Sequence, residues 1–185
     1  MIRRSLRTLS VLAVLLSLSV LTMSGIALAD NRWPLHWKQN PGGGYDRWVP
    51  YVDQTNPSIY GSYWDHVASH YYYADDHIYP YEACSGCGGN IVGKSYYYNA
   101  SWWGLTQVLS DDGTHQFAVD VHLDEADSLT GSQIHSLICH ELGHAVGLAH
   151  RSLPDWSCLR SGDVWPEDFD AHDTSTLWNY YYHTD

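Results

Sequence analysis

The stretch that decides the fold and the chemistry of this chain is His140-Glu-Leu-Gly-His-Ala-Val-Gly-Leu-Ala-His150, which has the pattern H-E-x-x-H-x-x-G-x-x-H. An α-helix has 3.6 residues per turn, so His140 and His144 lie one turn apart on the same face and both imidazoles can reach one metal ion. Gly147 lies where the chain must leave the helix, and glycine adopts the positive φ that such an exit often requires. The third histidine, His150, can then turn back towards the same ion.

Three histidines and one adjacent carboxylate have the composition of a catalytic zinc site. Three protein ligands leave the fourth tetrahedral position open, which distinguishes a catalytic site from a closed structural one. Glu141 projects beside the metal, where its carboxylate can take a proton from zinc-bound water. The sequence therefore predicts one zinc ion held by His140, His144 and His150, with Glu141 as the general base. A helix that carries histidines on its polar face by chance is the alternative, which the extended pattern disfavours.

The same eleven residues resemble the motif of the metzincin zinc endopeptidases, which is matched at all three histidines, the glutamate and the second glycine. The resemblance extends more loosely over residues 102–162. Because position 150 is His rather than Asp, the motif is more similar to that of the matrixins than to that of the small snapalysins. The resemblance implies an α+β fold, in which a twisted mixed sheet and two long helices form a zinc cleft between upper and lower subdomains.

The chain departs from this family at the methionine turn that lies beneath the zinc. Its methionines, Met1 and Met23, both lie in the N-terminal leader. Residues 157–162 stand where the turn is expected, and we align Leu159 with the methionine because Leu and Met have similar volumes and exchange at little cost. No tyrosine occurs two residues after Leu159, where some relatives carry an extra ligand, so a plain three-histidine site is favoured.

Residues 1–29 have the features of a secretory signal peptide. Three arginines precede an apolar run at residues 9–21, and Ala27-Leu-Ala29 offers small residues for cleavage. A permanent membrane anchor is disfavoured because the run is short for a spanning helix. We therefore predict a secreted, extracellular protein in which residues 30–185 form a single metallopeptidase catalytic domain.

The chain is strongly acidic, with 9 basic residues against 21 acidic ones and a formal net charge of −12. Such a charge repels nucleic acid and anionic membranes, so we expect neither as a partner. We expect a monomer that acts on a protein or peptide substrate. We interpret the acidity as a means of solubility outside the cell. Calcium binding is the alternative, because six acidic residues crowd the approach to the zinc helix. Their spacing, however, does not match a recognisable calcium-binding loop. They are Asp111, Asp112, Asp120, Asp124, Glu125 and Asp127.

Four cysteines in an exported chain favour disulfides over free thiols. The sequence alone permits several pairings. We favour Cys139 with Cys158, because this bridge would tie the start of the zinc helix to the turn beneath the metal. Cys84 and Cys87 would then pair in a tight Cys-Ser-Gly-Cys loop. Half of a structural zinc site is the alternative for this C-x-x-C pair, but the chain has no second such pair to complete it.

Hydrophobic periodicity predicts the remaining elements. Helices are expected at residues 60–74, 131–147 and 174–182, strands at 77–81, 91–98, 101–109 and 117–123, and an irregular lead-in at 30–56. Ser132 is the expected cap of the zinc helix, and Phe117, Val119, Val121 and Leu123 are expected to point inwards. By the resemblance, residues 103–106 form the edge strand of the cleft, to which a peptide substrate can add as an antiparallel strand. His66 and His70 lie one turn apart, and we interpret them as polar helix positions, with a second metal as the alternative.

Two functions of different classes remain open from the sequence. The first is a secreted zinc-dependent endopeptidase that hydrolyses peptide bonds by Glu141-assisted attack of zinc-bound water. The second is a catalytically silent zinc-containing domain that binds a polymer or a protein, and it is motivated by the absent methionine and by the 15 Tyr and 9 Trp residues. We interpret most of these aromatic residues as core. Glu141 favours the enzyme, because a silent site has no need of a carboxylate there.

Overall fold

The computed structural model describes residues 32–38, 47–74, 77–84, 88–152, 156–162 and 165–183. Asn31–Asp185 form one compact unit. The predicted signal peptide, residues 1–29, lies outside the described residues. Within the described ranges, no helix has the length and apolar character that crossing a membrane requires.

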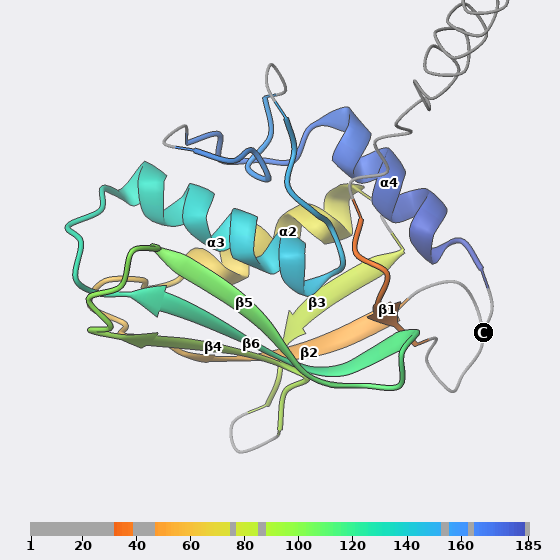
Figure 1. The fold of residues 1–185 in the computed structure, drawn as a ribbon, viewed down its shortest axis with the longest axis horizontal. Coiled ribbons are helices and arrows are strands. Elements are labelled where there is room, and N and C mark those ends of the chain that lie inside the picture. Colours follow the sequence, from red (N-terminus) through yellow and green to blue (C-terminus); the bar gives the residue numbers. More distant parts are fainter. Residues whose placement is uncertain are drawn as a thin grey trace, which may run out of the picture. The chain divides into compact units, whose positions relative to one another are not determined.

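The unit is built on one mixed β-sheet of six strands (Figure 1). The strands are β1 (His36–Trp37), β2 (Arg47–Gln54), β3 (Ile78–Glu82), β4 (Ile91–Tyr96), β5 (Gly104–Asp111) and β6 (His115–Asp124). Five of them are parallel and follow the order β1-β6-β4-β2-β3, whereas β5 pairs antiparallel with β6. In the described part of the chain β5 pairs with β6 alone, so it is the edge strand that the sequence predicted.

The described residues of this unit also form three helices, α2 (Tyr63–Ala74), α3 (Gly131–Ala145) and α4 (Ala171–Tyr181). Helices α2 and α3 lie on the same face of the sheet (Figure 1). The core lies between these layers, where Trp64 from α2, Ile91 and Val121 from the strands, and Ile138 and Leu142 from α3 are almost fully buried. Burial of each such side chain stabilises the fold by about 1.5–3 kcal/mol. The mixed sheet with helices on one face is consistent with the predicted α+β class.

Helix α3 begins at Gly131 as predicted, but its N-cap lies two residues before the predicted cap. Thr130 is the N-cap, and it forms a capping box in which its side chain accepts from Gln133 N and Gln133 Oε1 accepts from Thr130 N at 2.9 Å. Ser132, the predicted cap, instead lies in the first turn of the helix. At the other end Gly147 has a φ of +98°, as the motif predicted. This exit sends the chain back towards the histidine face.

The predicted irregular lead-in at residues 30–56 is wrong, because it contains β1 and β2. The sequence of β2 contains a proline, which argued against a strand. Proline has no backbone N–H to donate to a neighbouring strand. In the structure β2 pairs with β4 only from Tyr51 onwards. Pro50 therefore lies just outside the part of β2 that is paired with a strand on each side. Arg47 at the start of β2 is fully buried, and its guanidinium donates to Tyr181 O at 2.7 Å and to His183 O at 2.8 Å. The strand thus also holds the C-terminal end of α4.

The predicted inward alternation of β6 is correct for Val119, Val121 and Leu123 but wrong for Phe117, which is 39% exposed. The β5–β6 register shifts between Val108 and Ser110 and again between Ser110 and Asp111. Such irregularities move side chains to the opposite face of a strand. Gln116 is therefore the buried residue at this end of β6, and its Nε2 donates to Ala145 O of α3 at 2.6 Å.

Candidate metal centre

The three predicted zinc ligands converge at the C-terminal end of α3. His140 Nε2 lies 3.0 Å from His144 Nε2 and 3.1 Å from His150 Nε2. A tetrahedral zinc ion with bonds of about 2.0–2.1 Å separates its ligand nitrogens by roughly 3.3 Å. Both distances from His140 Nε2 are close to this spacing, and the ligand atoms of all three rings lie within 4.8 Å of one another. Imidazole is also a ligand type that zinc prefers.

Backbone carbonyls fix the orientation of two of these rings. His140 Nδ1 lies 2.7 Å from Cys158 O, and His144 Nδ1 lies 2.8 Å from Leu148 O. A carbonyl oxygen can only accept, so each Nδ1 carries the proton and donates it. This tautomer leaves the Nε2 lone pair directed at the common point, which is how metal-binding histidines are usually held.

The electrostatic environment keeps these imidazoles neutral. Burial lowers the pKa of His140 to about 4 and that of His144 to about 3, and the neighbouring histidines disfavour the cation further. Burial also lowers the pKa of His150. At neutral pH all three rings are therefore in the unprotonated form that binds a metal.

Glu141 lies beside the histidines as a buried carboxyl, with 4% of its surface exposed. Thr106 Oγ1, from β5, lies 2.7 Å from its Oε2 and 2.9 Å from its backbone oxygen. Burial raises the pKa of Glu141 to about 7, although the hydrogen bonds from Thr106 oppose this shift. A carboxyl group with a pKa near neutrality can both accept and return a proton.

Gly104 lies in the expected edge strand, and the absence of a side chain there leaves room for the Glu141 carboxyl group. A Cβ atom at position 104 would lie 2.5 Å from Glu141 Oε1 and 2.7 Å from its Cγ. The edge strand β5 therefore approaches α3 so closely that only glycine fits. A glycine inside a strand pattern often marks a close backbone approach, and this signal was present in the sequence.

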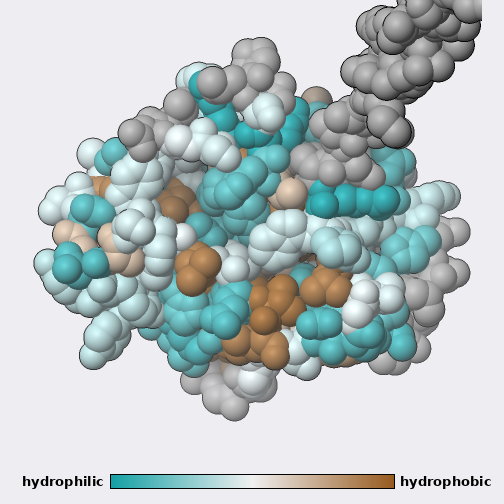
Figure 2. Space-filling view, in the orientation of Figure 1, coloured by the Kyte–Doolittle hydropathy of each residue, from teal (hydrophilic) through white to brown (hydrophobic). Residues whose placement is uncertain are grey.

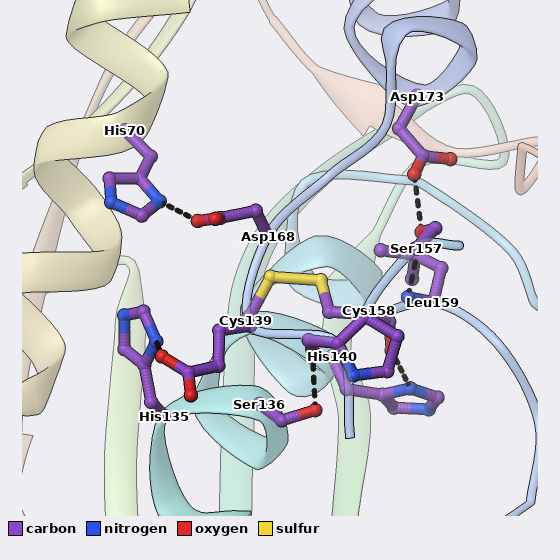
Figure 3. The surroundings of a disulfide bond; sticks show 12 residues. His70, His135, Ser136, Cys139, His140, Ser157, Cys158, Leu159, Asp168 and Asp173 are labelled. Carbon is purple, nitrogen blue, oxygen red and sulfur yellow. Dashed lines mark hydrogen bonds and ion pairs between the residues drawn. A yellow bond between two sulfur atoms is a disulfide. The ribbon is translucent and has the colours of Figure 1, made fainter. Parts of the chain in front are cut away.

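Leu159 lies under α3, where the resemblance placed a methionine. It is fully buried, and a Cβ atom at Gly143, between His140 and His144 in the sequence, would lie 2.9 Å from Leu159 Cδ2. The preceding residue, Cys158, forms a disulfide with Cys139 of α3 (Figure 3). The predicted Cys139–Cys158 bridge is thus confirmed. The other predicted bridge involves Cys87, which lies outside the described residues.

The disulfide supports both the fold and the centre, because the Cys158 carbonyl holds His140. We expect the double substitution of Cys139 and Cys158 by Ala to lower the free energy of unfolding by about 3 kcal/mol, the value for a loop of this length. Loss of the anchored carbonyl should also weaken zinc binding, by about 10- to 100-fold. Urea unfolding and zinc titration measure the two effects. An unchanged zinc affinity in the folded double variant would show that the bridge does not position His140.

A cavity of about 220 Å³ opens beside His140, Glu141 and His150. Trp103 and Trp165 form part of its wall, and their ring centroids lie 4.8 Å apart. The cavity offers an apolar side chain a place directly beside the histidines and the carboxyl group.

One further aromatic residue at the centre had no signal in the sequence. The ring of Trp33 stacks on that of His144, with centroids 5.2 Å apart and an interplanar angle of 6°. Trp33 N also donates to Gly147 O at 2.7 Å. The segment before β1 therefore shields one face of the His144 ring and holds the helix exit.

The six acidic residues considered for calcium do not gather into a ligand group. In the described ranges, the groups of three or more potential ligand residues with ligand atoms within 4.8 Å of one another consist of histidines only. Asp124 instead uses its carboxylate to accept backbone N–H groups of Tyr98, Asn99, Ala100 and Ala126 at 2.8–3.3 Å. These bonds order the segment that leads into β5, so Asp124 has a structural role.

Comparison with known proteins identifies solved structures with a similar fold. No family model and no curated protein matches the sequence. Two solved structures of myroilysin are similar to this chain. One has a TM-score of 0.56 at 11% identity and covers 80% of this chain and 97% of that chain. The other has a TM-score of 0.50 at 13% identity, with coverage of 86% and 97%. At these identities the likeness concerns the fold, and this chain therefore has a fold similar to that of myroilysin.

Proposed function

We propose that this protein is a zinc-dependent endopeptidase of the metzincin type. One observation carries the proposal: three neutral imidazoles converge beside a buried carboxyl with a pKa near 7, and His140, His150 and Glu141 line one open cavity. A structural zinc site would need a fourth protein ligand, and three histidines leave that position open for chemistry. Zinc bound there supplies Lewis acidity, which activates a water molecule and polarises a peptide carbonyl.

Glu141 moves the proton in this reaction. Its carboxylate accepts a proton from the attacking water as the new C–O bond forms, and it then returns the proton to the leaving amine as the C–N bond breaks. Its pKa of about 7 suits both steps at neutral pH. Thr106 positions the carboxyl group through Oε2, so the base is held by the edge strand that would also bind the substrate.

Strand β5 offers the substrate a place to bind. Its outer edge has no strand partner in the described part of the chain, and Leu105 and Leu109 on it are 44% and 54% exposed. Figure 2 shows apolar side chains gathered along this strand. A peptide can add to such an edge as an antiparallel strand, with main-chain hydrogen bonds that align its carbonyl with the histidines. An apolar side chain then fits the cavity beside Trp103 and Trp165.

Chelation tests the proposal. We expect the purified protein to cleave unfolded casein, to lose this activity when a chelator removes the metal, and to regain it when zinc is added back. Zinc binding without cleavage of casein or of a diverse peptide library would instead support the silent binding domain. The exposed aromatic residues Tyr96 and Tyr97, at 69% and 65% exposure, favour that alternative, whereas the raised pKa of Glu141 favours the enzyme.

The Thr106 contact leads to a prediction about pH. The hydroxyl of Thr106 lowers the pKa of Glu141, and Thr106→Val removes this hydroxyl while it keeps the backbone N–H, so the substitution should raise the pKa further. A base with a higher pKa stays protonated up to a higher pH. The acid limb of the kcat/KM profile should therefore move to higher pH, by about one pH unit. Serine in place of Thr106 keeps the hydroxyl and serves as the control. A Thr106→Val profile that overlays the wild-type profile would show that Thr106 does not act on the base.

A further inference from the structure

A second group of three histidines lies apart from the metal centre. His66 and His70 of α2 meet His135 of α3, and one ring nitrogen of each lies within 4.8 Å of the others. The ring centroids are 4.6 Å apart for His66 and His135, 5.0 Å for His66 and His70, and 5.7 Å for His70 and His135. The sequence analysis interpreted His66 and His70 as polar helix positions, because only the fold brings His135 to them.

Two of these rings are held by carboxylates. His135 Nδ1 lies 3.1 Å from Glu167 Oε2, and His70 Nδ1 lies 2.7 Å from Asp168 Oδ1. Figure 3 shows His70 and His135 coming from two different helices, with Asp168 directed at His70. A carboxylate that accepts from Nδ1 fixes the ring and makes Nε2 a better ligand, and such pairs commonly support metal sites. The arrangement parallels the main centre, where carbonyls have this role.

The Nε2 atom of His135 supplies an independent sign that a ligand is missing. The His135 side chain is only 6% exposed, and its Nε2 is buried without a hydrogen-bond partner. With the Nδ1 proton donated to Glu167, the Nε2 of a neutral ring is an acceptor with no donor. Burial and the nearby His66 lower the pKa of His135, which favours the neutral ring. Buried polar atoms rarely stay unsatisfied, and a metal ion would satisfy this one.

An ion can reach this group from solvent. His66 is exposed, and a surface cavity of about 450 Å³ is lined by His66 and His135 together with Tyr63, Ser132 and Glu167. A bound ion requires ligand nitrogens roughly 3.3 Å apart, so the rings must close in. The exposed ring of His66 has the freedom to make this movement. His70 and His135 are already oriented by their carboxylates.

We propose that His66, His70 and His135 form a second metal site, which takes a divalent transition metal such as zinc. Imidazole ligands select zinc, copper or nickel over calcium and magnesium, which prefer oxygen. The ion would tie α2 to α3, and through Glu167 and Asp168 it would also fix the segment that precedes α4. This site does not depend on the proposed peptidase activity, because it shares no ligand with the main centre.

Zinc stoichiometry tests the second site in the full chain. His66→Ala and His70→Ala should each bind one equivalent of zinc fewer than the wild type, after equilibration with buffered zinc and measurement by atomic absorption. His172→Ala removes an exposed histidine of α4 and should retain the wild-type stoichiometry. If the main centre failed to bind zinc, the number of zinc equivalents per chain would be one lower in every protein. The wild type would still bind one equivalent more than His66→Ala or His70→Ala. Equal stoichiometry in His66→Ala, His70→Ala and His172→Ala would overturn the proposal.

Two further measurements separate metal binding from a merely structural role. Zinc should raise the unfolding temperature of His66→Ala less than that of the wild type, while the metal-free proteins should unfold at similar temperatures because His66 is exposed. Asp168→Asn should weaken zinc binding at this site by about 10- to 100-fold, since it removes the carboxylate behind His70. An equal zinc-induced shift in His66→Ala and the wild type would contradict the second site.

Discussion

Glu141→Gln is expected to lower kcat/KM for peptide cleavage by about 10²–10⁴-fold, the contribution of a positioned general base. The amide has nearly the same shape as the carboxyl group but cannot accept the proton of the attacking water. Zinc content should stay at the wild-type level, because none of the three Nε2 atoms belongs to the altered residue. Steady-state cleavage of a fluorogenic peptide and metal analysis of the same sample measure both quantities.

His172→Ala is a suitable control for Glu141→Gln, because it alters an exposed side chain on α4 and should retain full activity. Wild-type turnover in Glu141→Gln would show that another group acts as the base. Loss of zinc together with activity would show that Glu141 instead helps to hold the metal. Only inactivity with the metal retained agrees with the proposed role.

Gly104→Ala is expected to lower kcat/KM by about 100-fold without loss of zinc. The new Cβ would stand 2.5 Å from Glu141 Oε1, so either the carboxyl group or the edge strand must shift. A displacement of about 1 Å at a reacting group can cost this factor. The three atoms nearest to the new Cβ all belong to Glu141, whereas the Nδ1 bonds of His140 and His144 go to Cys158 O and Leu148 O.

Gly88→Ala is the matched control for Gly104→Ala, because a Cβ at Gly88 meets no atom within 4 Å. It should leave both activity and zinc content unchanged. A crystal structure of Gly104→Ala should show Glu141 displaced from Thr106. Wild-type activity in Gly104→Ala would mean that the close approach of β5 to Glu141 plays no part in catalysis.

Local spacing made the convergence of the three histidines predictable from the sequence. The positions of His140 and His144 follow from the helical period, and Gly147 permits the return to His150. These features depend on residues close together in the chain. The position of Leu159 and its neighbour's disulfide to Cys139 were also predictable, because the resemblance supplied the turn and the predicted secretion of the chain favoured a disulfide.

Features that depend on distant contacts could not be predicted. Strand β2 contains a proline, and its place in the sheet follows from pairing with β3 and β4 rather than from its own composition. Phe117 points outwards because of register shifts between β5 and β6, which no alternating pattern reveals. His135 joins His66 and His70 only because α2 and α3 pack side by side.

The position of zinc in crystals of the wild-type protein is the most direct test of the metal centre. We predict that an anomalous difference map at the zinc absorption edge has a peak about 2.0–2.1 Å from the Nε2 atoms of His140, His144 and His150. The refined coordinates of the same crystals should place Glu141 beside this peak but outside its ligand shell. Absence of a peak between the three rings, in zinc-grown crystals with α3 intact, would contradict the three-histidine centre.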